Sequence, residues 1–177
     1  MAKYYTMIGS RSTPKEIYNI MVKVAAKLKS QGWVVRSGGA DGADSAAEDG
    51  CSYECMNIYL PWDGFNGRNS INRGYIDTTK LKTYNLAQKI AEETHPAWER
   101  CSRGARGLHT RNVYQVLGND LNTLSQFVIC WAETSGNKGH VKGGTATAVS
   151  LALKNNIPVI NLYTDDGLKG VMEFLEE

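Results

Sequence analysis

The feature that most constrains the fold is a regular alternation of short apolar runs with longer segments of helical periodicity. The first apolar run, Tyr4–Ile8, is rich in β-favouring residues and stops at Gly9. The next segment, 14–31, carries apolar residues at helical spacing and stops before Gly32. Parallel strands need such crossover helices between them. The sequence therefore predicts an α/β fold, a doubly wound, mostly parallel sheet of about five or more strands with helices on both faces.

The same alternation continues to the end of the chain. Residues 126–132 form a near-continuous apolar run, which is typical of a buried central strand. The first helix begins with a capping-box pattern in which Thr13 is the N-cap, Pro14 follows it and Glu16 lies three residues after the cap. The predicted strands are 4–8, 33–36, 56–60, 126–132 and 157–162, and the predicted helices are 14–31, 43–51, 84–94, 108–117, 144–155 and 167–177.

Length and composition indicate one globular domain. The chain has 177 residues, close to the ~150 of an average domain. Its 18 Gly and 4 Pro are too few for a collagen-like or disordered chain. We expect a single domain over residues 1–177, with a long irregular insertion at about 61–83 and a polar, Arg-rich stretch at about 96–107.

The charge balance excludes a global polycation. Twenty Lys and Arg against eighteen Asp and Glu give a net charge of +2, so any contact with nucleic acid requires a local patch. No apolar stretch approaches the ~20 residues of a membrane span, and the start of the chain, Met1–Tyr5, lacks the apolar core of a signal peptide. We expect a cytoplasmic protein with no membrane partner.

The cysteines and histidines do not have the spacing of a metal site. Four cysteines are few for a disulfide scaffold, and reduced thiols are expected. Cys51 and Cys55 lie one helical turn apart, but the histidines, His95, His109 and His140, show no finger-like spacing around them. We expect no structural metal and no cofactor.

Three small, polar loops follow predicted strands or precede a predicted helix, namely 9–11, 37–42 and 142–147. Ligands of such sheets bind outside the carboxyl ends of the strands, where glycines and helix N-termini favour phosphate. The alternative is that these glycines only make tight turns. Neither the GxGxxG fingerprint nor a Walker A ending is present, which disfavours a dehydrogenase or a P-loop NTPase. The candidate phosphate-binding residues are Gly9, Ser10, Arg11, Ser37, Gly38, Gly39, Asp41, Gly42, Gly143, Gly144, Thr145 and Thr147.

Four motifs together resemble one family. The segment 37–47, SGGADGADSAA, resembles the SG-x-A-x-G-I-D-x-x-A segment of the DprA/Smf DNA-processing proteins. Residues 9–11 are similar to their first phosphate loop, 111–112 to their Arg-Asn element and 144–148 to their G-S-x-x-T-A turn. The resemblance implies a stand-alone Rossmann-like nucleotide-binding domain of the wider DprA-like and LOG-like (SLOG) superfamily, with a nucleotide or single-stranded DNA as partner and a homodimer or higher homo-oligomer as assembly.

The same superfamily implies a second function. LOG-type enzymes hydrolyse the N-glycosidic bond of nucleoside monophosphates, and residues 109–112 resemble their M-H-x-R-K element. Their P-G-G-x-G-T-x-x-E motif is half present, with Ser150 at the place of the catalytic glutamate. The alternative to a nucleotide-binding protein is therefore a nucleotide N-glycosidase or phosphoribohydrolase that uses Arg111 and Glu133 as catalytic residues. Asp41 and Glu48 are further candidate carboxylates, and the sequence leaves open whether the protein is an enzyme.

Arginines and aromatic residues are interleaved between residues 62 and 106. Such a pattern suits the stacking of bases of single-stranded nucleic acid. The interpretation we favour is a solvated cover over the site or a dimer surface. The residues concerned are Trp62, Phe65, Arg68, Arg73, Tyr75, Trp98, Arg100, Arg103 and Arg106.

Overall fold

The computed structural model describes all residues from 1 to 177 and contains one six-stranded sheet in the order β4-β3-β2-β1-β5-β6. Every neighbouring pair of strands is parallel, which confirms the predicted fold class. The strands are β1 (Lys3–Gly9), β2 (Trp33–Ser37), β3 (Met56–Leu60), β4 (Tyr75–Asp77), β5 (Val128–Trp131) and β6 (Val159–Asn161).

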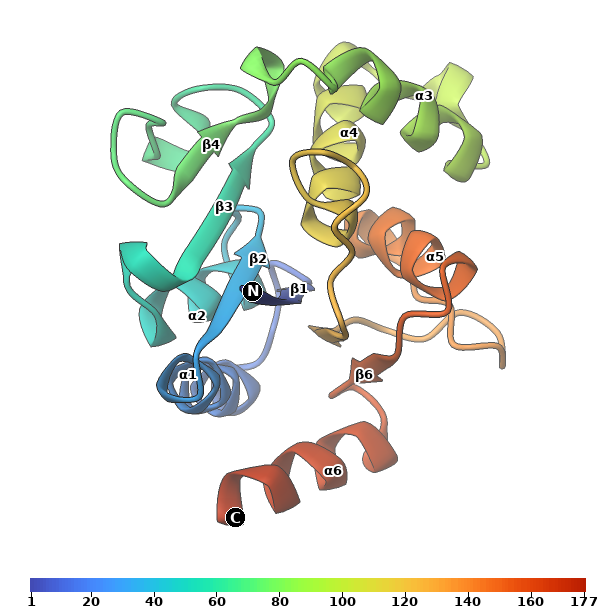
Figure 1. Ribbon diagram of the computed structural model, residues 1–177. Helices are drawn as coiled ribbons and strands as arrows, with labels where there is room; N and C mark the ends of the chain where they lie inside the picture. The colour runs from blue at the N-terminus through green and yellow to red at the C-terminus, as the bar shows by residue number, and fades with distance from the viewer.

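Helices cover both faces of the sheet. Figure 1 shows α1, α2 and α6 on one side and α3, α4 and α5 on the other, and the contacts between helices divide in the same way. The α-helices are α1 (Lys15–Ser30), α2 (Ala43–Gly50), α3 (Tyr84–Thr94), α4 (Arg103–Leu117), α5 (Ala146–Lys154) and α6 (Asp165–Glu176). Short 3-10 turns are η1 (Tyr53–Cys55), η2 (Phe65–Gly67), η3 (Thr78–Lys80), η4 (Trp98–Arg100) and η5 (Gly143–Thr145).

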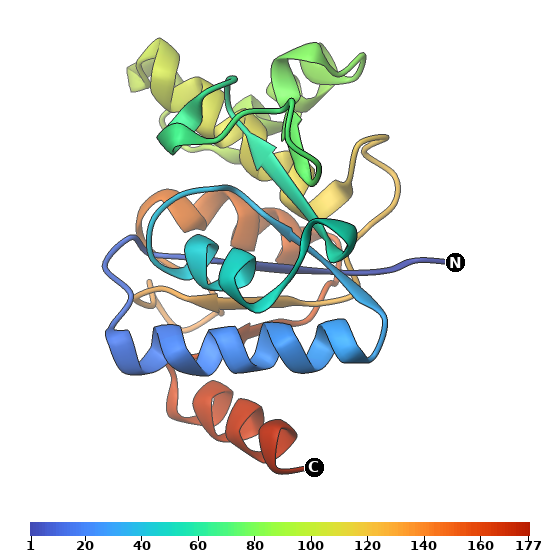
Figure 2. The ribbon, with the colours of Figure 1, turned by 90° about the vertical axis from the view of Figure 1, so that its left-hand side faces the viewer.

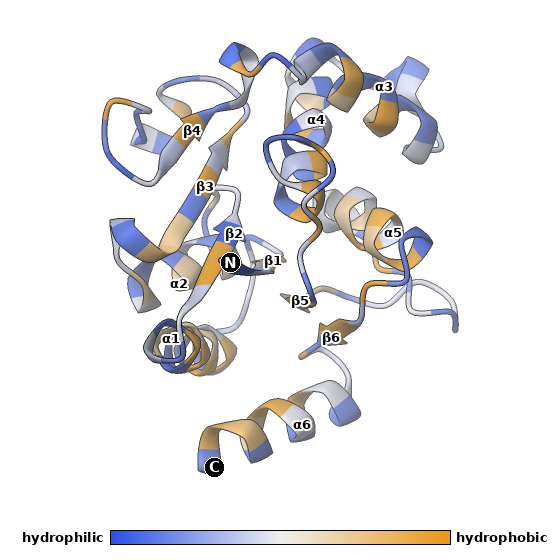
Figure 3. Ribbon diagram, in the orientation of Figure 1, coloured by the Kyte–Doolittle hydropathy of each residue, from blue (hydrophilic) through white to orange (hydrophobic).

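The hydrophobic core lies in two layers because successive strand residues point to opposite faces. On β1, Met7 packs with residues of α1 and α2, whereas Ile8 packs with residues of α4 and α5. On β5, Ile129 belongs to the first layer and Cys130 to the second. Strands covered on both faces read as mostly apolar runs, and parts of β2 and β6 accordingly appear in orange in Figure 3. This burial explains why the strands were evident in the sequence.

Two local predictions near the first helix and in the long insertion are wrong in detail. The capping box does not form, because Pro14 is the N-cap residue and the Thr13 hydroxyl donates to the Ser10 carbonyl at 2.6 Å. The stretch 61–83 is not wholly irregular, since it contains the edge strand β4, which pairs with β3. A three-residue strand is too short to leave a periodic signal in the sequence.

The Arg-rich stretch 96–107 is also partly helical. The helix α4 begins at Arg103, five residues before the predicted start, and the Ser102 hydroxyl caps it by accepting from the Ala105 amide at 3.1 Å. The sparse apolar residues of its first turn hid this start. All four cysteines are unpaired. None of the helices combines the length and apolar character needed to cross a membrane.

The order of strands places a switch point between β1 and β5. From β1 the sheet grows through β2 and β3 to β4, whereas from β5 it grows to β6 at the opposite edge. In Figure 2, β1 runs from the N-terminus at the right to the left edge, where the chain turns into α1. At such a switch point the loops run in opposite directions, and a crevice forms between them at the carboxyl ends of the strands.

Candidate functional site

A cleft of about 630 Å³ lies at this switch point, within the usual size of ligand sites. The loop after β1 contributes Gly9, Ser10 and Arg11, and the segment after β5 contributes Ala132 and Glu133. The turn η5 forms part of the wall through all three of its residues. Side chains from the middle of α4 complete the lining, namely Leu108, His109, Arg111, Asn112 and Gln115. Two of the three predicted loops, and the predicted Arg111, thus meet in one place.

Arg111 is the most buried cation in the cleft. Its side chain lies on α4, is 5% exposed, and is held by two hydrogen bonds: Nε donates to Asn112 Oδ1 at 2.9 Å and Nη1 donates to the Gly38 carbonyl. Burial lowers the pKa of Arg111 to about 10, the charge of Asp44 opposes this shift, and the like charge of Arg11 adds to it. At neutral pH Arg111 remains a cation whose position is fixed by the protein.

Gly38 makes room for this arginine. A Cβ atom at position 38 would overlap the guanidinium of Arg111 and the side-chain amide of Gln115. Glycine at position 38 therefore allows the loop after β2 to approach α4 closely. Gly38 itself does not line the cleft. Its predicted neighbour Ser37 is also structural, because its buried hydroxyl donates to the Met7 carbonyl at 2.6 Å.

The N-terminus of α5 opens into the cleft. The turn η5 runs directly into α5, so the first N–H groups of this helical segment have no intrahelical acceptor. Asn112 fixes the turn by donating from Nδ2 to the Gly144 carbonyl at 2.8 Å. Open space lies over Gly143 and Gly144, where an added Cβ would meet nothing within 4 Å. These amides and the helix dipole favour an anion at this point.

The second predicted loop, 37–42, and the start of α2 make their hydrogen bonds within the protein. The carboxylate of Asp44, in the first turn of α2, accepts from the Ala40 amide at 3.2 Å and is 4% exposed. The Ala43 amide donates to the Ser10 carbonyl at 3.4 Å, and Gly42 allows this contact, since a Cβ there would overlap the Ser10 carbonyl. Acceptors of the protein itself, the Asp44 carboxylate and the Ser10 carbonyl, therefore bind the amides at the N-terminus of α2.

The remaining residues of this loop lie outside the cleft. Asp41 is exposed and accepts from Asn66 Nδ2 at 3.0 Å, and Gly39 lies against the Arg68 side chain. Burial raises the pKa of Asp44 to about 6, against the opposing influence of Arg111. Sequence reasoning did not single out Asp44, although the available signal was that Asp44, and not Asp41, stands at the fixed Asp of the SG-x-A-x-G-I-D-x-x-A segment that residues 37–47 resemble.

Glu133 lies at the mouth of the cleft and is exposed. Its carboxylate accepts from Lys142 Nζ at 2.7 Å, and its side chain retains 56% exposure. Ser150 lies on α5 outside the cleft, in contact with His140 Nδ1 at 3.2 Å. Glu48 is engaged elsewhere, with Arg68 Nε at 2.6 Å and the Tyr75 hydroxyl. No buried carboxylate other than Asp44 lines the cleft.

Two aromatic rings form one wall of the cleft. Trp131 ends β5, Tyr163 follows β6, and their ring centroids are 5.5 Å apart in an edge-to-face arrangement. Tyr163 is 44% exposed, so its ring is accessible to a ligand. Sequence reasoning missed this pair because the two residues belong to separate strands. The positions directly after β5 and β6 were the available signal.

His109 lies where α4 meets α5. Its ring lines the cleft, and Nδ1 lies 3.0 Å from the hydroxyl of Thr147, which is buried and does not line the cleft. Burial lowers the pKa of His109 to about 4, and the nearby His95 and Arg111 add to this shift. The imidazole is therefore neutral at physiological pH.

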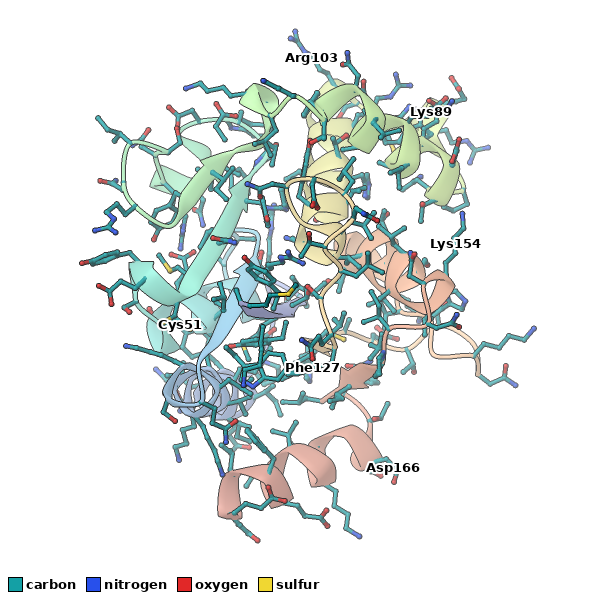
Figure 4. All side chains as sticks on the ribbon, viewed as in Figure 1. Cys51, Lys89, Arg103, Phe127, Lys154 and Asp166 are labelled. Atoms are coloured by element: carbon teal, nitrogen blue, oxygen red, sulfur yellow. The ribbon has the colours of Figure 1, made fainter.

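The interleaved arginines and aromatics do not form one free surface. Arg68 pairs with Glu48, and Arg106 lies over the Trp98 ring at 5.3 Å while donating to the Trp98 carbonyl. Trp98 is itself buried. Arg100 and Arg103 are exposed beside the start of α4, and Figure 4 shows Arg103 projecting away from the sheet.

Comparison with known proteins relates the chain to DNA-processing proteins. Residues 1–59, from β1 into β3, match the family model of DNA recombination-mediator protein A. The structure resembles that of DNA processing protein A from Helicobacter pylori, a protein with a unique single-stranded DNA binding mode, with a TM-score of 0.54 and 21% identity over 97% of this chain and 72% of that one. DNA processing protein A (DprA) from Streptococcus pneumoniae matches with a TM-score of 0.49 and 16% identity, over 99% of this chain and 56% of that one. No curated protein sequence matches.

Proposed function

We propose that this chain, a DprA-like domain, binds single-stranded DNA and holds a backbone phosphate in the cleft between β1 and β5. The observation that carries the proposal is the convergence of two guanidinium groups, Arg11 and Arg111, on the open N-terminus of η5. The ion pairs of the chain are Arg68–Glu48, Lys80–Asp77 and Lys142–Glu133, so neither arginine takes part in a salt bridge, although the charge of the buried Asp44 acts on Arg111.

An anion would relieve the repulsion between these two arginines. Their like charges contribute to the lowered pKa of Arg111. A phosphate between them would accept charge-assisted hydrogen bonds from both and from the η5 amides. The bonds that hold Arg111 use Nε and Nη1, which leaves Nη2 for the ligand. The donors lie in the loop after β1, in α4 and in η5, so the fold itself brings them together.

The aromatic wall supplies a place for a base. A nucleotide whose phosphate lies at Arg11 would stack its base on Tyr163, with Trp131 packed behind that ring. Base stacking of this kind is tolerant of sequence. A nucleoside monophosphate would occupy the same cleft with one phosphate, and it would bind less tightly than a strand that continues beyond it.

Replacing Arg11 tests the proposal. Arg11→Ala removes one charge-assisted contact, so we expect affinity for a labelled oligothymidylate, measured by fluorescence anisotropy, to fall about 10-fold. The slope of log affinity against log salt should become shallower by about 0.7, the contribution of one phosphate on a single strand.

Lys29→Ala is the matched control. This exposed lysine lies near the far end of α1, and its replacement removes one charge outside the cleft. Equal losses in the two variants would contradict a phosphate site at Arg11, because only the net charge would then matter.

An N-glycosidic hydrolase is the second candidate, and the observation in its favour is that Glu133 lines the cleft beside Arg111. The pairing of Glu133 with Lys142 and its exposure weaken the case, because the carboxylate is already engaged by a cation and open to solvent. We expect chromatography to detect no free base after incubation with nucleoside monophosphates. Release of base that Glu133→Gln abolishes would instead establish the enzyme.

A further inference from the structure

Two histidines and one cysteine from three segments meet between α3 and α4. His95 follows α3, Cys101 follows η4 and His109 lies in α4, and their nitrogen and sulfur atoms all lie within 4.8 Å of one another. Cys101 Sγ is 3.9 Å from each ring nitrogen of His95. The His95 and His109 rings have centroids 4.3 Å apart. All three residues are half-buried.

We propose that His95, Cys101 and His109 bind a divalent transition-metal ion of the Zn²⁺ class. Ligands at ~2.0–2.3 Å from zinc in a tetrahedron lie about 3.3–3.8 Å apart. The observed separations exceed this by about 1 Å or less, which small side-chain rotations remove. One thiolate and two imidazoles are the donor types that zinc prefers over magnesium or calcium. Three protein ligands leave the fourth position to water.

A neighbouring hydroxyl orients one of the ligands. The Thr147 hydroxyl lies 3.0 Å from His109 Nδ1. When Nδ1 donates its proton to this oxygen, the lone pair of Nε2 is available to an ion, and such outer contacts commonly orient ligating histidines. On His95, the ion would replace the Ala97 amide that donates to Nδ1 at 3.0 Å.

The local sequence explains why linear spacing did not reveal this cluster. Pro96 keeps His95 in an extended conformation and ends α3. The buried Trp98 anchors the following turn, which brings Cys101 back beside His95. His109 arrives from α4 about two turns beyond the Ser102 cap. The three donors therefore meet through the packing of α3 on α4, and not through a fixed finger-like spacing.

Binding is balanced by the release of one proton. The Cys101 thiol becomes a thiolate as the metal–sulfur bond forms, and its proton passes to solvent. An imidazole that binds in its neutral form through a nitrogen lone pair releases none. No oxidation or reduction is involved.

Titration of the full chain with Co²⁺, a spectroscopic substitute for Zn²⁺, tests the site. We expect one equivalent to produce a cobalt–thiolate charge-transfer band and the visible bands of a four-coordinate ion, which Zn²⁺ then abolishes. Cys101→Ser should lose the charge-transfer band, whereas the control Cys55→Ser, at a half-buried free cysteine outside the cluster, should keep it. Thr147→Val should weaken Co²⁺ binding roughly 10- to 100-fold.

A second measurement uses the unaltered protein. Zn²⁺ should slow the alkylation of Cys101 by iodoacetamide, followed by peptide mass spectrometry, and should leave the alkylation of Cys55 unchanged. Absence of the charge-transfer band at one equivalent of Co²⁺, retention of the band in Cys101→Ser, or equal alkylation of Cys101 with and without Zn²⁺ would each overturn the proposal.

Discussion

At the scale of single residues, the cleft depends on groups that hold Arg111 in place. Gly38 leaves space for the guanidinium and accepts a hydrogen bond from it, and Asn112 joins it to the η5 turn. Arg111 is therefore a fixed cation, in contrast to the exposed Arg11. A side chain held in place before binding loses less conformational entropy when the ligand arrives.

Gly38→Ala should destabilise the protein and disturb the cleft. The new Cβ would displace Arg111 and Gln115, and overpacking of this kind costs about 1–3 kcal/mol. Urea denaturation measures the loss. Gly170→Ala is the matched control, because nothing lies within 4 Å of that position in α6 and Ala is favoured over Gly in a helix by about 0.5–1 kcal/mol. Equal stability of the Gly38→Ala variant and the original protein would contradict the packing described.

Asp44 should make stability depend on pH. Its pKa is about 6 in the folded protein, above the ordinary value of 3.8, so the folded state binds the proton more tightly than the unfolded chain. The resulting stabilisation is complete below about pH 4 and is lost as pH rises through about 6, a change of roughly 3 kcal/mol. Arg111 and Glu48 are the charged groups that act on it.

Asp44→Asn removes this titration and keeps an oxygen for the Ala40 amide. Urea denaturation at pH 4.5 and pH 7 should show a smaller difference in unfolding free energy for the variant than for the original protein. An identical difference in the two proteins would mean that Asp44 ionises normally. Other carboxylates titrate in both proteins, and the comparison cancels their contribution.

At the scale of elements, the strands and their order along the chain could be predicted from the sequence. Which side chains from distant elements meet at the cleft could not. The runs at β1 and β5 are mostly apolar because both faces of the sheet are covered. In contrast, Arg111 and Gly38 are 73 positions apart, and no local pattern marks their contact. The same holds for Tyr163, which reaches the cleft only because β6 lies beside β5.

The contribution of the Arg-rich stretch to DNA binding can be tested at the start of α4. Arg100 and Arg103 are its exposed cations, since Arg106 is held by Trp98. The double variant Arg100→Ala, Arg103→Ala should make the salt slope for single-stranded DNA shallower by about 1.4 and leave binding of a nucleoside monophosphate unchanged.

The double variant Lys89→Ala, Lys154→Ala is the control for this experiment, because it removes two charges from α3 and α5 at sites labelled in Figure 4. A double arginine variant that behaves like this control would identify the stretch as a cover or a contact between subunits instead of a DNA surface.

At the scale of the whole molecule, the net charge of +2 offers little long-range attraction for DNA. Affinity must therefore come from local cations, chiefly from Arg11 and Arg111 beside the η5 amides in the cleft. The fold concentrates these groups because the loops after β1 and β5 diverge at the switch point. Binding should be strongest at low salt, where screening is least.

The most direct test of this account is to follow backbone amide signals by NMR while unlabelled oligothymidylate is added to the ¹⁵N-labelled chain at low salt. The account predicts that the largest shifts occur at Arg11 and at Gly143, Gly144 and Thr145, whose amides face the bound phosphate. Lys29, at the far end of α1, should not shift. Shifts confined to the surface outside the cleft, or no shifts at all, would contradict it.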